Sequence, residues 1–384
     1  MKIIMRWGCV KAKKFSLTEH TEVTENIDFI DSFLCVLRAL CEKFMLLHNF
    51  LLLIPFSLFP FDEAKLNTTL SSWEKKNKNE VIVLITNPES GKIEFAYTEK
   101  NAFYKKLPPG SILKTLSSFV FLANQEKFHI SSEKKYFCNG KFEEPKKDYF
   151  KEEDKIKFNL VEDTKTGKRY FRCSKENGHG EVILRKALAE SCNAYYLHYA
   201  STDSEFFYNT LIHDWRLEEG TGASFERTSN AKNLTYKNPT PFESSLASIG
   251  DDGQIKLTAL KVAQIYGSIF AETPILMPIL KGETPKQISP FPYSDSIRRK
   301  IQQALRLTVK EGTLKLIHLQ NTSIQILSGK TGTPTREGKK YTTHGWNIIY
   351  FKKGDNAYLL VVFVDKGSGK KEALELSTVI LNIL

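Results

Sequence analysis

Apolar residues recur along this chain at a period that changes several times, and each change marks a predicted element. From residue 112 to residue 123 they return every three or four positions, the spacing of one buried helical face. The same spacing predicts helices over residues 257–271, 294–310 and 371–384. Residues 181–200 also follow it, but Ser191 and Asn193 interrupt the apolar pattern. This interruption indicates either a kink or a site.

Short runs rich in β-branched and aromatic residues predict the strands. One run, over residues 80–96, predicts an early hairpin. Three more runs lie near the C-terminus, over residues 324–330, 341–351 and 357–365. Together they make one five-stranded antiparallel sheet with helices on both sides. The predicted fold class is therefore α+β.

Two stretches lack this periodicity. Residues 62–79 are polar and are interpreted as a linker. The region of about residues 125–177 is dense in Lys, Glu and Asp and predicts a solvated insertion. The chain is thus predicted to comprise an N-terminal extension (1–61), the linker and one main domain (80–384).

The longest apolar run covers residues 44–61. A transmembrane helix needs about 20 apolar residues, and this run is interrupted by His48, Asn49, Pro55 and Pro60. It favours a secretory signal over a stable anchor, and its two prolines speak against a core helix. We therefore expect a periplasmic or otherwise extracytoplasmic protein, secreted or held at the inner membrane by this segment. Met45 could itself begin the signal, with residues 1–43 as an over-extended start.

Composition changes this picture little. A chain of 384 residues with 41% hydrophobic and 26% charged residues can bury a large core, and one main domain is enough to use it. The formal net charge of +11 suits an anionic surface. No basic module with interleaved aromatic residues is visible, so nucleic acid is a poor candidate partner.

Ser111 and Lys114 form the first candidate site. The pattern Ser-x-x-Lys also begins at Ser72, Ser131, Ser132, Ser229 and Ser368. Only the copy at Ser111 follows a stiff Leu-Pro-Pro-Gly turn and opens an apolar helix. At a spacing of three, a helix places both side chains on one face. This copy therefore predicts a serine nucleophile beside an amine.

Two further motifs follow in the chain. Ser191-Cys192-Asn193 is the polar interruption already noted, and it is the one Ser-x-Asn in the sequence. Lys330-Thr331-Gly332-Thr333 ends a predicted strand, whereas the other Lys-Thr-Gly, at Lys165, lies in a charged stretch. A phosphate-binding loop would need glycine at position 324, which is Ile324. The pattern therefore excludes a nucleotide-binding loop here.

In this order the three motifs resemble the transpeptidase domain of penicillin-binding proteins. The similarity extends over roughly residues 80–384 and includes segments 249–263, 310–313 and 344–346. Two departures occur: Asp251 and Asp252 split the glycines of a Gly-Gln-Gly motif, and Ala259 replaces a proline. The resemblance is to class B, elongation-type enzymes, which act in cell shape. Only about fifty residues separate the apolar run from Ser111, so the N-terminal pedestal domain is expected to be missing.

The resemblance implies a fold and an activity. The fold is that of penicillin-binding proteins and serine β-lactamases, a five-stranded antiparallel sheet flanked by helices. The activity is that of a peptidoglycan D,D-transpeptidase, which acts on D-alanyl-D-alanine stem peptides through an acyl-serine intermediate and is inhibited by β-lactams. It needs no cofactor for catalysis. The implied partners are stem peptides, β-lactam antibiotics and a membrane glycan polymerase.

The resemblance also assigns roles. Ser111 would be the nucleophile and Lys114 its general base, made neutral by burial and by a second cation, Lys330. Ser191 would relay a proton towards the departing amine, and Asn193 would hold the substrate amide and Lys114.

The substrate's terminal carboxylate would bind at the Lys-Thr-Gly-Thr motif that ends the predicted strand over residues 324–330. The residues expected to bind it are Lys330, Thr331, Gly332 and Thr333. Trp346 is interpreted either as a wall of the cleft or as a core aromatic residue.

Other activities remain open. With water as acceptor the enzyme would be a D,D-carboxypeptidase. A penicillin-recognising hydrolase or antibiotic sensor is a second class, although Ser191-Cys192-Asn193 lacks the aliphatic third residue of class D β-lactamases. A non-catalytic wall-assembly component is a third.

Three cysteines of the main domain, Cys138, Cys173 and Cys192, are an awkward number for disulfides. With His179 they offer four ligands suited to tetrahedral zinc, and the series resembles a region of elongation-type class B enzymes that holds zinc in some members. Such a zinc would be structural, because four protein ligands leave no open position. The alternatives are a disulfide between Cys138 and Cys173 with a buried Cys192, or free thiols.

Overall fold

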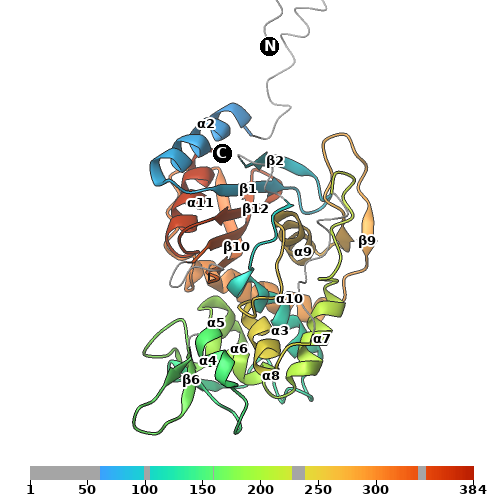
Figure 1. Ribbon diagram of the computed structural model, residues 1–384. Coiled ribbons are helices and arrows are strands. Elements are labelled where there is room, and N and C mark those ends of the chain that lie inside the picture. The colour runs from blue at the N-terminus through green and yellow to red at the C-terminus, as the bar shows by residue number, and fades with distance from the viewer. Residues whose placement is uncertain (1–60, 99–103, 159, 227–237, 336–342) are drawn as a thin grey trace, which may run out of the picture. The chain divides into compact units, whose positions relative to one another are not determined.

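The computed structural model describes residues 61–384, except residues 99–103, 159, 227–237 and 336–342 (Figure 1). The predicted extension and its apolar run therefore lie outside the described residues, apart from Phe61. Within the described ranges, no helix has the length and apolar character needed to cross a membrane.

A five-stranded antiparallel sheet forms the centre of residues 61–384. Its strands stand in the order β10-β11-β12-β1-β2, which confirms the predicted pairing of an early hairpin with three late strands. Their bounds are β1 (Val81–Thr86), β2 (Ile93–Tyr97), β10 (Ile324–Gly332), β11 (Gly345–Lys353) and β12 (Asn356–Val364). Strand β10 lies at one edge of this sheet, and among the described residues no strand pairs with its outer side.

The two faces of the sheet belong to two hydrophobic clusters. Because side chains of a strand alternate between faces, Leu359, Val361 and Phe363 of β12 join one cluster, whereas Leu360, Val362 and Val364 join the other. Helix α9 (Ala259–Ala271) covers the first face, and α11 (Glu372–Ile383) covers the second (Figure 1). The predicted α+β layering is confirmed.

Residues 62–79 are not a linker, contrary to the sequence interpretation. They form α2 (Glu63–Asn77), which Asp62 caps by accepting from the Lys65 N–H. Its residues Leu66, Leu70 and Trp73 are buried in the second cluster. Their spacing of four and three positions is helical, but the polar residues around them concealed it in the sequence.

The remaining helices surround the first cluster. They are η3 (Gly110–Ile112), α3 (Leu113–Ala123), α5 (Leu184–Ala189), α6 (Asn193–Ala200), α7 (Ser204–Asp214), α8 (Pro241–Leu246), η5 (Ala247–Ile249) and α10 (Asp295–Lys310). A short two-stranded ribbon, β8 (Ile275–Leu276) with β9 (Gln287–Ser289), lies between α9 and α10 in the chain. The interruption at residues 190–192 separates α5 from α6, so the predicted helical stretch is two helices.

The predicted insertion is folded rather than merely solvated. It contains the ribbon β3 (Tyr136–Cys138) with β7 (Gly180–Val182), helix α4 (Glu152–Lys157), and a small sheet of β4 (Lys141–Glu143), β6 (Arg169–Arg172) and β5 (Val161–Glu162). Phe150 and Phe242 of α8 pack edge to face, with ring centroids 4.6 Å apart. The charged surface residues hid these few aromatic residues, which are enough to bury one side of the insertion.

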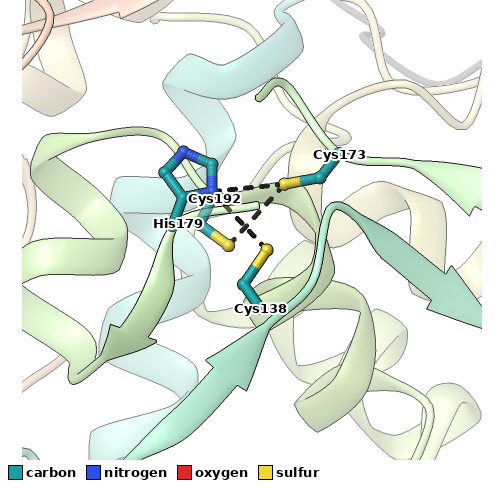
Figure 2. Close-up of side chains that lie close together, drawn as sticks. All are labelled: Cys138, Cys173, His179 and Cys192. Atoms are coloured by element: carbon teal, nitrogen blue, oxygen red, sulfur yellow. Dashed lines mark hydrogen bonds between the residues drawn. The ribbon is translucent and has the colours of Figure 1, made fainter. Parts of the chain in front are cut away.

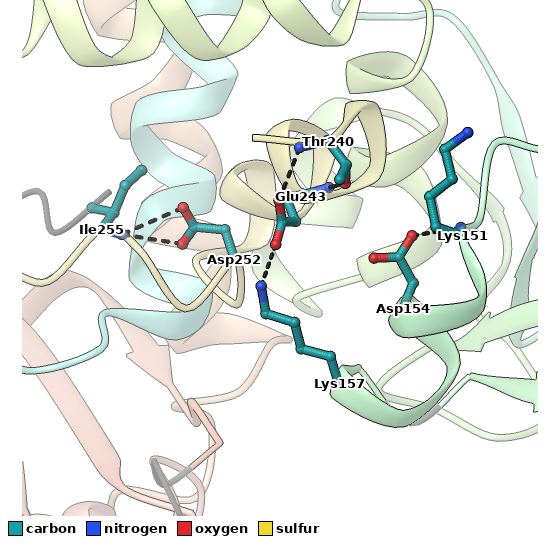
Figure 3. Close-up of polar contacts among 7 residues, drawn as sticks. All are labelled: Lys151, Asp154, Lys157, Thr240, Glu243, Asp252 and Ile255. Atoms are coloured by element: carbon teal, nitrogen blue, oxygen red, sulfur yellow. Dashed lines mark hydrogen bonds and ion pairs between the residues drawn. The ribbon is translucent and has the colours of Figure 1, made fainter. Parts of the chain in front are cut away.

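Polar contacts also tie the insertion to α8. The Lys157 ammonium pairs with the Glu243 carboxylate, which in turn accepts from the Thr240 N–H in a capping box (Figure 3). In the loop that follows, both carboxylate oxygens of the buried Asp252 accept from the Ile255 N–H at 3.3 Å (Figure 3). The loop that carries the split glycine motif is therefore held by its own side chains.

Candidate active site

Three segments distant in the sequence contact the turn before Ser111. The Trp346 indole N–H donates to the Pro108 carbonyl at 3.0 Å, and the Gly110 N–H donates to the Gly250 carbonyl at 3.0 Å. Gly110 also lies so close to Pro334 that a Cβ at position 110 would meet its nitrogen at 2.7 Å. Ser111 therefore starts η3 from a backbone that three distant segments hold.

Gly250 provides a test of this arrangement. Its φ of +72° is left-handed, and a Cβ there would lie 2.2 Å from the Gly110 carbonyl oxygen. Gly253, in the same loop, has a φ of +75° and no neighbour within 4 Å of its Cβ position. Alanine at either position should cost about 1–2 kcal/mol for the left-handed backbone. Gly250→Ala must in addition displace the turn that carries Ser111, so we expect it to lower the free energy of unfolding in urea by at least about 2 kcal/mol more than Gly253→Ala. Equal losses would contradict the close packing of the two turns.

Lys114 is completely buried and lies among four oxygen atoms. Its Nζ is 3.0 Å from Ser111 Oγ and 2.6 Å from Asn193 Oδ1. It also lies 3.1 Å from Ser191 Oγ and 2.8 Å from the Ser191 carbonyl oxygen. The structure thus brings the first two sequence motifs together at one amine.

Lys330 joins the same group from β10. It is fully buried, and its Nζ lies 3.2 Å from Ser191 Oγ and 2.9 Å from the Thr331 carbonyl oxygen. The Ser191 hydroxyl therefore stands between the two lysines. All three predicted motifs meet within one connected set of polar contacts.

Ser191 has an unusual backbone. Its φ of +63° is left-handed, which is strained for a residue with a Cβ. The break between α5 and α6 turns its carbonyl oxygen toward Lys114, and the Ser174 hydroxyl also donates to this oxygen at 2.9 Å. The predicted kink and the predicted site are thus the same feature.

The end of β10 passes directly beside the Ser111 turn. A Cβ on Gly332 would lie 3.0 Å from both the Pro109 carbonyl oxygen and the Ile112 side chain. Thr333 is exposed, and its Oγ1 accepts from the Gly369 N–H at 3.0 Å. The backbone of Gly332 and Thr333 is therefore next to the serine, as carboxylate and oxyanion binding would require.

Two other predicted binding residues face away from solvent. Thr331 is buried, and its hydroxyl donates to Thr313 Oγ1 at 2.8 Å. Trp346 has no exposed surface and packs on Phe363, with ring centroids 4.8 Å apart. Of the two interpretations of Trp346, the structure favours the core aromatic residue that braces Pro108.

Burial dominates the electrostatics of the two lysines. It lowers the pKa of Lys114 to about 8, and the positive charge of Lys370 adds to the effect. Burial also holds the pKa of Lys330 well below its usual range, and repulsion by Lys114 and Lys370 adds to it. Sequence reasoning treated Lys330 as a fixed cation and Lys114 as the neutral partner. In the structure both are equally buried, so the pair does not easily carry two charges.

Two charged residues near the lysines were missed as site residues. Lys370 follows Gly369, which touches Thr333, and its charge acts on Lys114 and Lys330. Asp251 is half-buried and exerts an attractive field on Lys114. The two adjacent acids in a glycine loop were noted in the sequence, but nothing in the pattern placed them next to Ser111.

The four predicted metal ligands also come together. Their ligand atoms all lie within 4.8 Å of one another, and all four side chains are buried (Figure 2). His179 Nδ1 is 3.6 Å from Cys138 Sγ and 3.5 Å from Cys173 Sγ, and Cys173 Sγ is 3.7 Å from Cys192 Sγ. The structure has no disulfide bond among these three cysteines.

Known proteins supply an independent comparison. The family model described as "Penicillin binding protein transpeptidase domain" matches residues 150–383, a range that starts after Ser111 and Lys114. A search of curated proteins gives no match.

Solved structures share the fold at low identity. The transpeptidase domain of penicillin-binding protein 3 from Burkholderia pseudomallei is 16% identical, with a TM-score of 0.60 over 84% of this chain and 95% of that one. PBP2 from Pseudomonas aeruginosa is 15% identical, with a TM-score of 0.60 over 82% of this chain and 76% of that one. A chain of a peptidoglycan synthase complex is 18% identical, with a TM-score of 0.62. The match covers 83% of the present chain and 59% of the chain from the complex.

The family match covers more than half of the chain, and the solved structures that share its fold include penicillin-binding protein transpeptidase domains. The chain therefore belongs to the penicillin-binding protein transpeptidase domain family.

Proposed function

We propose that this protein is a peptidoglycan D,D-transpeptidase that uses Ser111 as its nucleophile. One observation carries the proposal: an unbroken set of contacts runs from Ser111 Oγ through Lys114 Nζ and Ser191 Oγ to Lys330 Nζ, at 3.0, 3.1 and 3.2 Å. This set gives a hydroxyl, a base and a proton path in one place.

The surroundings of Lys114 favour it as the base. A neutral amine has two N–H donors and one lone pair. Two of its four neighbours, the Ser191 carbonyl oxygen and Asn193 Oδ1, can only accept. When these acceptors take both hydrogens, the lone pair is left for a hydroxyl, and Ser111 Oγ lies 3.0 Å away.

Acylation then proceeds as follows. Lys114 takes the hydroxyl proton while Ser111 Oγ attacks the carbonyl carbon of the penultimate D-alanine. The C–N bond breaks, and the departing nitrogen receives a proton through Ser191. An amine of a second stem peptide then attacks the ester carbonyl carbon. The ester C–O bond breaks, Lys114 takes a proton from the attacking amine, and a proton returns to Ser111 Oγ. The oxyanion would rest on the N–H groups of Ser111 and Thr333, which adjacent segments bring together.

Substrate binding uses the free edge of the sheet. An extended stem peptide can add alongside β10 as a further strand. Its terminal carboxylate would then lie beside Thr333 and Lys330, with Lys370 as an additional positive charge. An anion bound there would also favour the protonated form of Lys330.

A fluorescent penicillin tests the proposal and its alternatives. We expect a stable covalent adduct that mass spectrometry assigns to the peptide containing Ser111. Rapid turnover of the drug would instead support a penicillin-recognising hydrolase. When stem peptides ending in D-alanyl-D-alanine are supplied, cross-linked products indicate a transpeptidase and shortened monomers indicate a carboxypeptidase. Absence of any adduct on the folded protein would overturn the proposed function.

The pH dependence of acylation tests the role of Lys114. A base works in its neutral form, so with a pKa of about 8 the rate constant should rise about tenfold per unit below pH 8 and level off above it. The measurement is the second-order rate constant for penicillin labelling from pH 6 to 10. Lys261, on α9, is another buried lysine, and burial lowers its pKa to about 8 as well. The Lys261→Met variant should show the same dependence of the labelling rate constant on pH as the wild type. Loss of the pH 8 midpoint in this variant would contradict Lys114 as the general base.

We propose zinc as the occupant of the Cys138, Cys173, His179 and Cys192 cluster. Tetrahedral zinc, with bonds of about 2.3 Å to sulfur and 2.0 Å to nitrogen, needs ligand atoms roughly 3.5–3.8 Å apart. The three distances of 3.5, 3.6 and 3.7 Å fit this geometry. Such a metal would hold the insertion to the break before α6, and it would take no part in the acyl transfer.

We also propose that the protein works outside the cytoplasm, where peptidoglycan is cross-linked. The apolar run at residues 44–61 supports this location as a signal or anchor. A partner that polymerises glycan is suggested by the peptidoglycan synthase complex among the proteins with this fold, and the fold is also seen in a Helicobacter pylori PBP2 complex with MreC. N-terminal sequencing and cell fractionation check the location.

A further inference from the structure

Asp251 lies in the loop between η5 and α9, next to the candidate active site. It follows Gly250, whose carbonyl oxygen accepts from the Gly110 N–H beneath Ser111. Its own Oδ1 accepts from the Thr335 N–H at 3.4 Å, and the Thr335 side chain bonds the same carboxylate. Thr335 stands two residues beyond Thr333. The loop of Gly250 and Asp251 is therefore hydrogen-bonded both to the turn before Ser111 and to the segment that follows β10.

The carboxylate also has an electrostatic role. Among the charges that act on Lys114, those of Cys173, Cys192 and, more weakly, Asp251 favour its ammonium form, whereas that of Lys370 disfavours it. Asp251 is the one carboxylate in this set. Its neighbour Asp252 is turned into the loop, where it accepts from the Ile255 N–H (Figure 3).

We propose that Asp251 is a positioning residue of the active site, whose carboxylate fastens the end of β10 to the loop beneath Ser111 and places a negative charge beside Lys114. This inference rests on the proposed acyl transfer by Ser111. The carboxylate keeps Thr333, and with it the proposed oxyanion donor, in register with the serine.

Two substitutions separate the two parts of this role. Asp251→Asn keeps an oxygen acceptor for Thr335 but removes the charge. Loss of the charge should favour neutral Lys114, so the midpoint of the acylation profile should move down by about half a pH unit. The rate constant at pH 7 should then rise about threefold, with an unchanged plateau at high pH. Asp251→Ala should show the same shift and also lower the plateau about tenfold, because the end of β10 is released.

Asp252→Asn is the matched control. Burial raises the pKa of Asp252 to about 7, so this carboxylate is largely ionised at the midpoint near pH 8, and we expect its removal to leave that midpoint unchanged. Thermal melting of each variant shows whether it is folded, and the readout is the profile of penicillin labelling against pH. A profile of Asp251→Asn that superimposes on the wild type, or an equal shift in Asp252→Asn, would overturn the electrostatic part. An unchanged plateau in Asp251→Ala would overturn the fastening part.

These outcomes are distinct from failure of the proposed function. If the unaltered protein forms no adduct with penicillin, acyl transfer by Ser111 is wrong. If it forms the adduct and the Asp251 variants behave as the wild type does, only the inference about Asp251 is wrong.

Discussion

Replacement of Ser111 by alanine is expected to abolish the covalent adduct with penicillin. The hydroxyl is the atom that would form the ester, and no other hydroxyl in the described residues lies in the same contact set except Ser191. In serine hydrolases, loss of the nucleophile lowers kcat by roughly 10⁶-fold. Labelling of Ser111→Ala should therefore fall below detection, while its melting temperature stays close to that of the wild type because Ser111 is only half-buried.

The chain offers a matched control for this experiment. Ser72 and Lys75 repeat the Ser-x-x-Lys spacing on α2, but there the serine hydroxyl donates to the Thr68 carbonyl at 2.8 Å. Ser72→Ala should be labelled at the wild-type rate. Persistent labelling of Ser111→Ala, or an adduct mapped to another serine, would show that the nucleophile has been assigned to the wrong residue.

The comparison of these two serines shows what the sequence could predict. Both motifs have the same spacing, so spacing alone could not choose between them. The Pro-Pro-Gly turn and the apolar helix after Ser111 selected the right context, because a stiff turn and a buried helix place a side chain reproducibly. The sheet was also predictable, because successive apolar side chains of β12 point to opposite faces of the sheet and are buried in both hydrophobic clusters.

Other features depended on contacts between distant segments. Asp251 and Lys370 come close to Lys114 through loops that follow η5 and β12, and no local pattern encodes that proximity. The full burial of Lys330 and Trp346 likewise depends on the whole fold. Helix α2 was missed because three apolar residues among many polar ones give a weak signal, although packing on the sheet supplies the missing stability.

The group of Cys138, Cys173, His179 and Cys192 was predictable from the sequence only in part. The residue types indicated zinc, but the sequence spacing left a disulfide and free thiols open. The structure brings the four candidate ligands, from β3, from the loop after β6, from the residue before β7 and from the break before α6, into one buried group. Cys192, between Ser191 and Asn193, thereby links the cluster to the active site.

Loss of one ligand is therefore expected to have a large effect. Structural zinc sites of this type contribute apparent free energies of about 10–16 kcal/mol in small domains. In this larger chain we expect Cys138→Ser to lower the metal content from about one zinc per chain to near zero and to lower the free energy of unfolding by several kcal/mol. Penicillin labelling should slow with it, because Ser191 and Asn193 flank a ligand. Metal analysis, urea unfolding and labelling of the same preparations measure the three effects.

A histidine pair supplies the control for the metal assignment. His179→Asn removes a ligand and should reproduce the losses of Cys138→Ser, whereas His213→Asn alters an exposed histidine on α7 and should change none of them. A chelator should lower the melting temperature of the wild type, and added zinc should restore it. Purified protein that holds no metal and melts at the same temperature with or without chelator would contradict zinc. If the mass of the protein without reductant is lower by two hydrogen atoms than its mass with reductant, the disulfide is favoured instead, because that bond forms only when two thiols are oxidised.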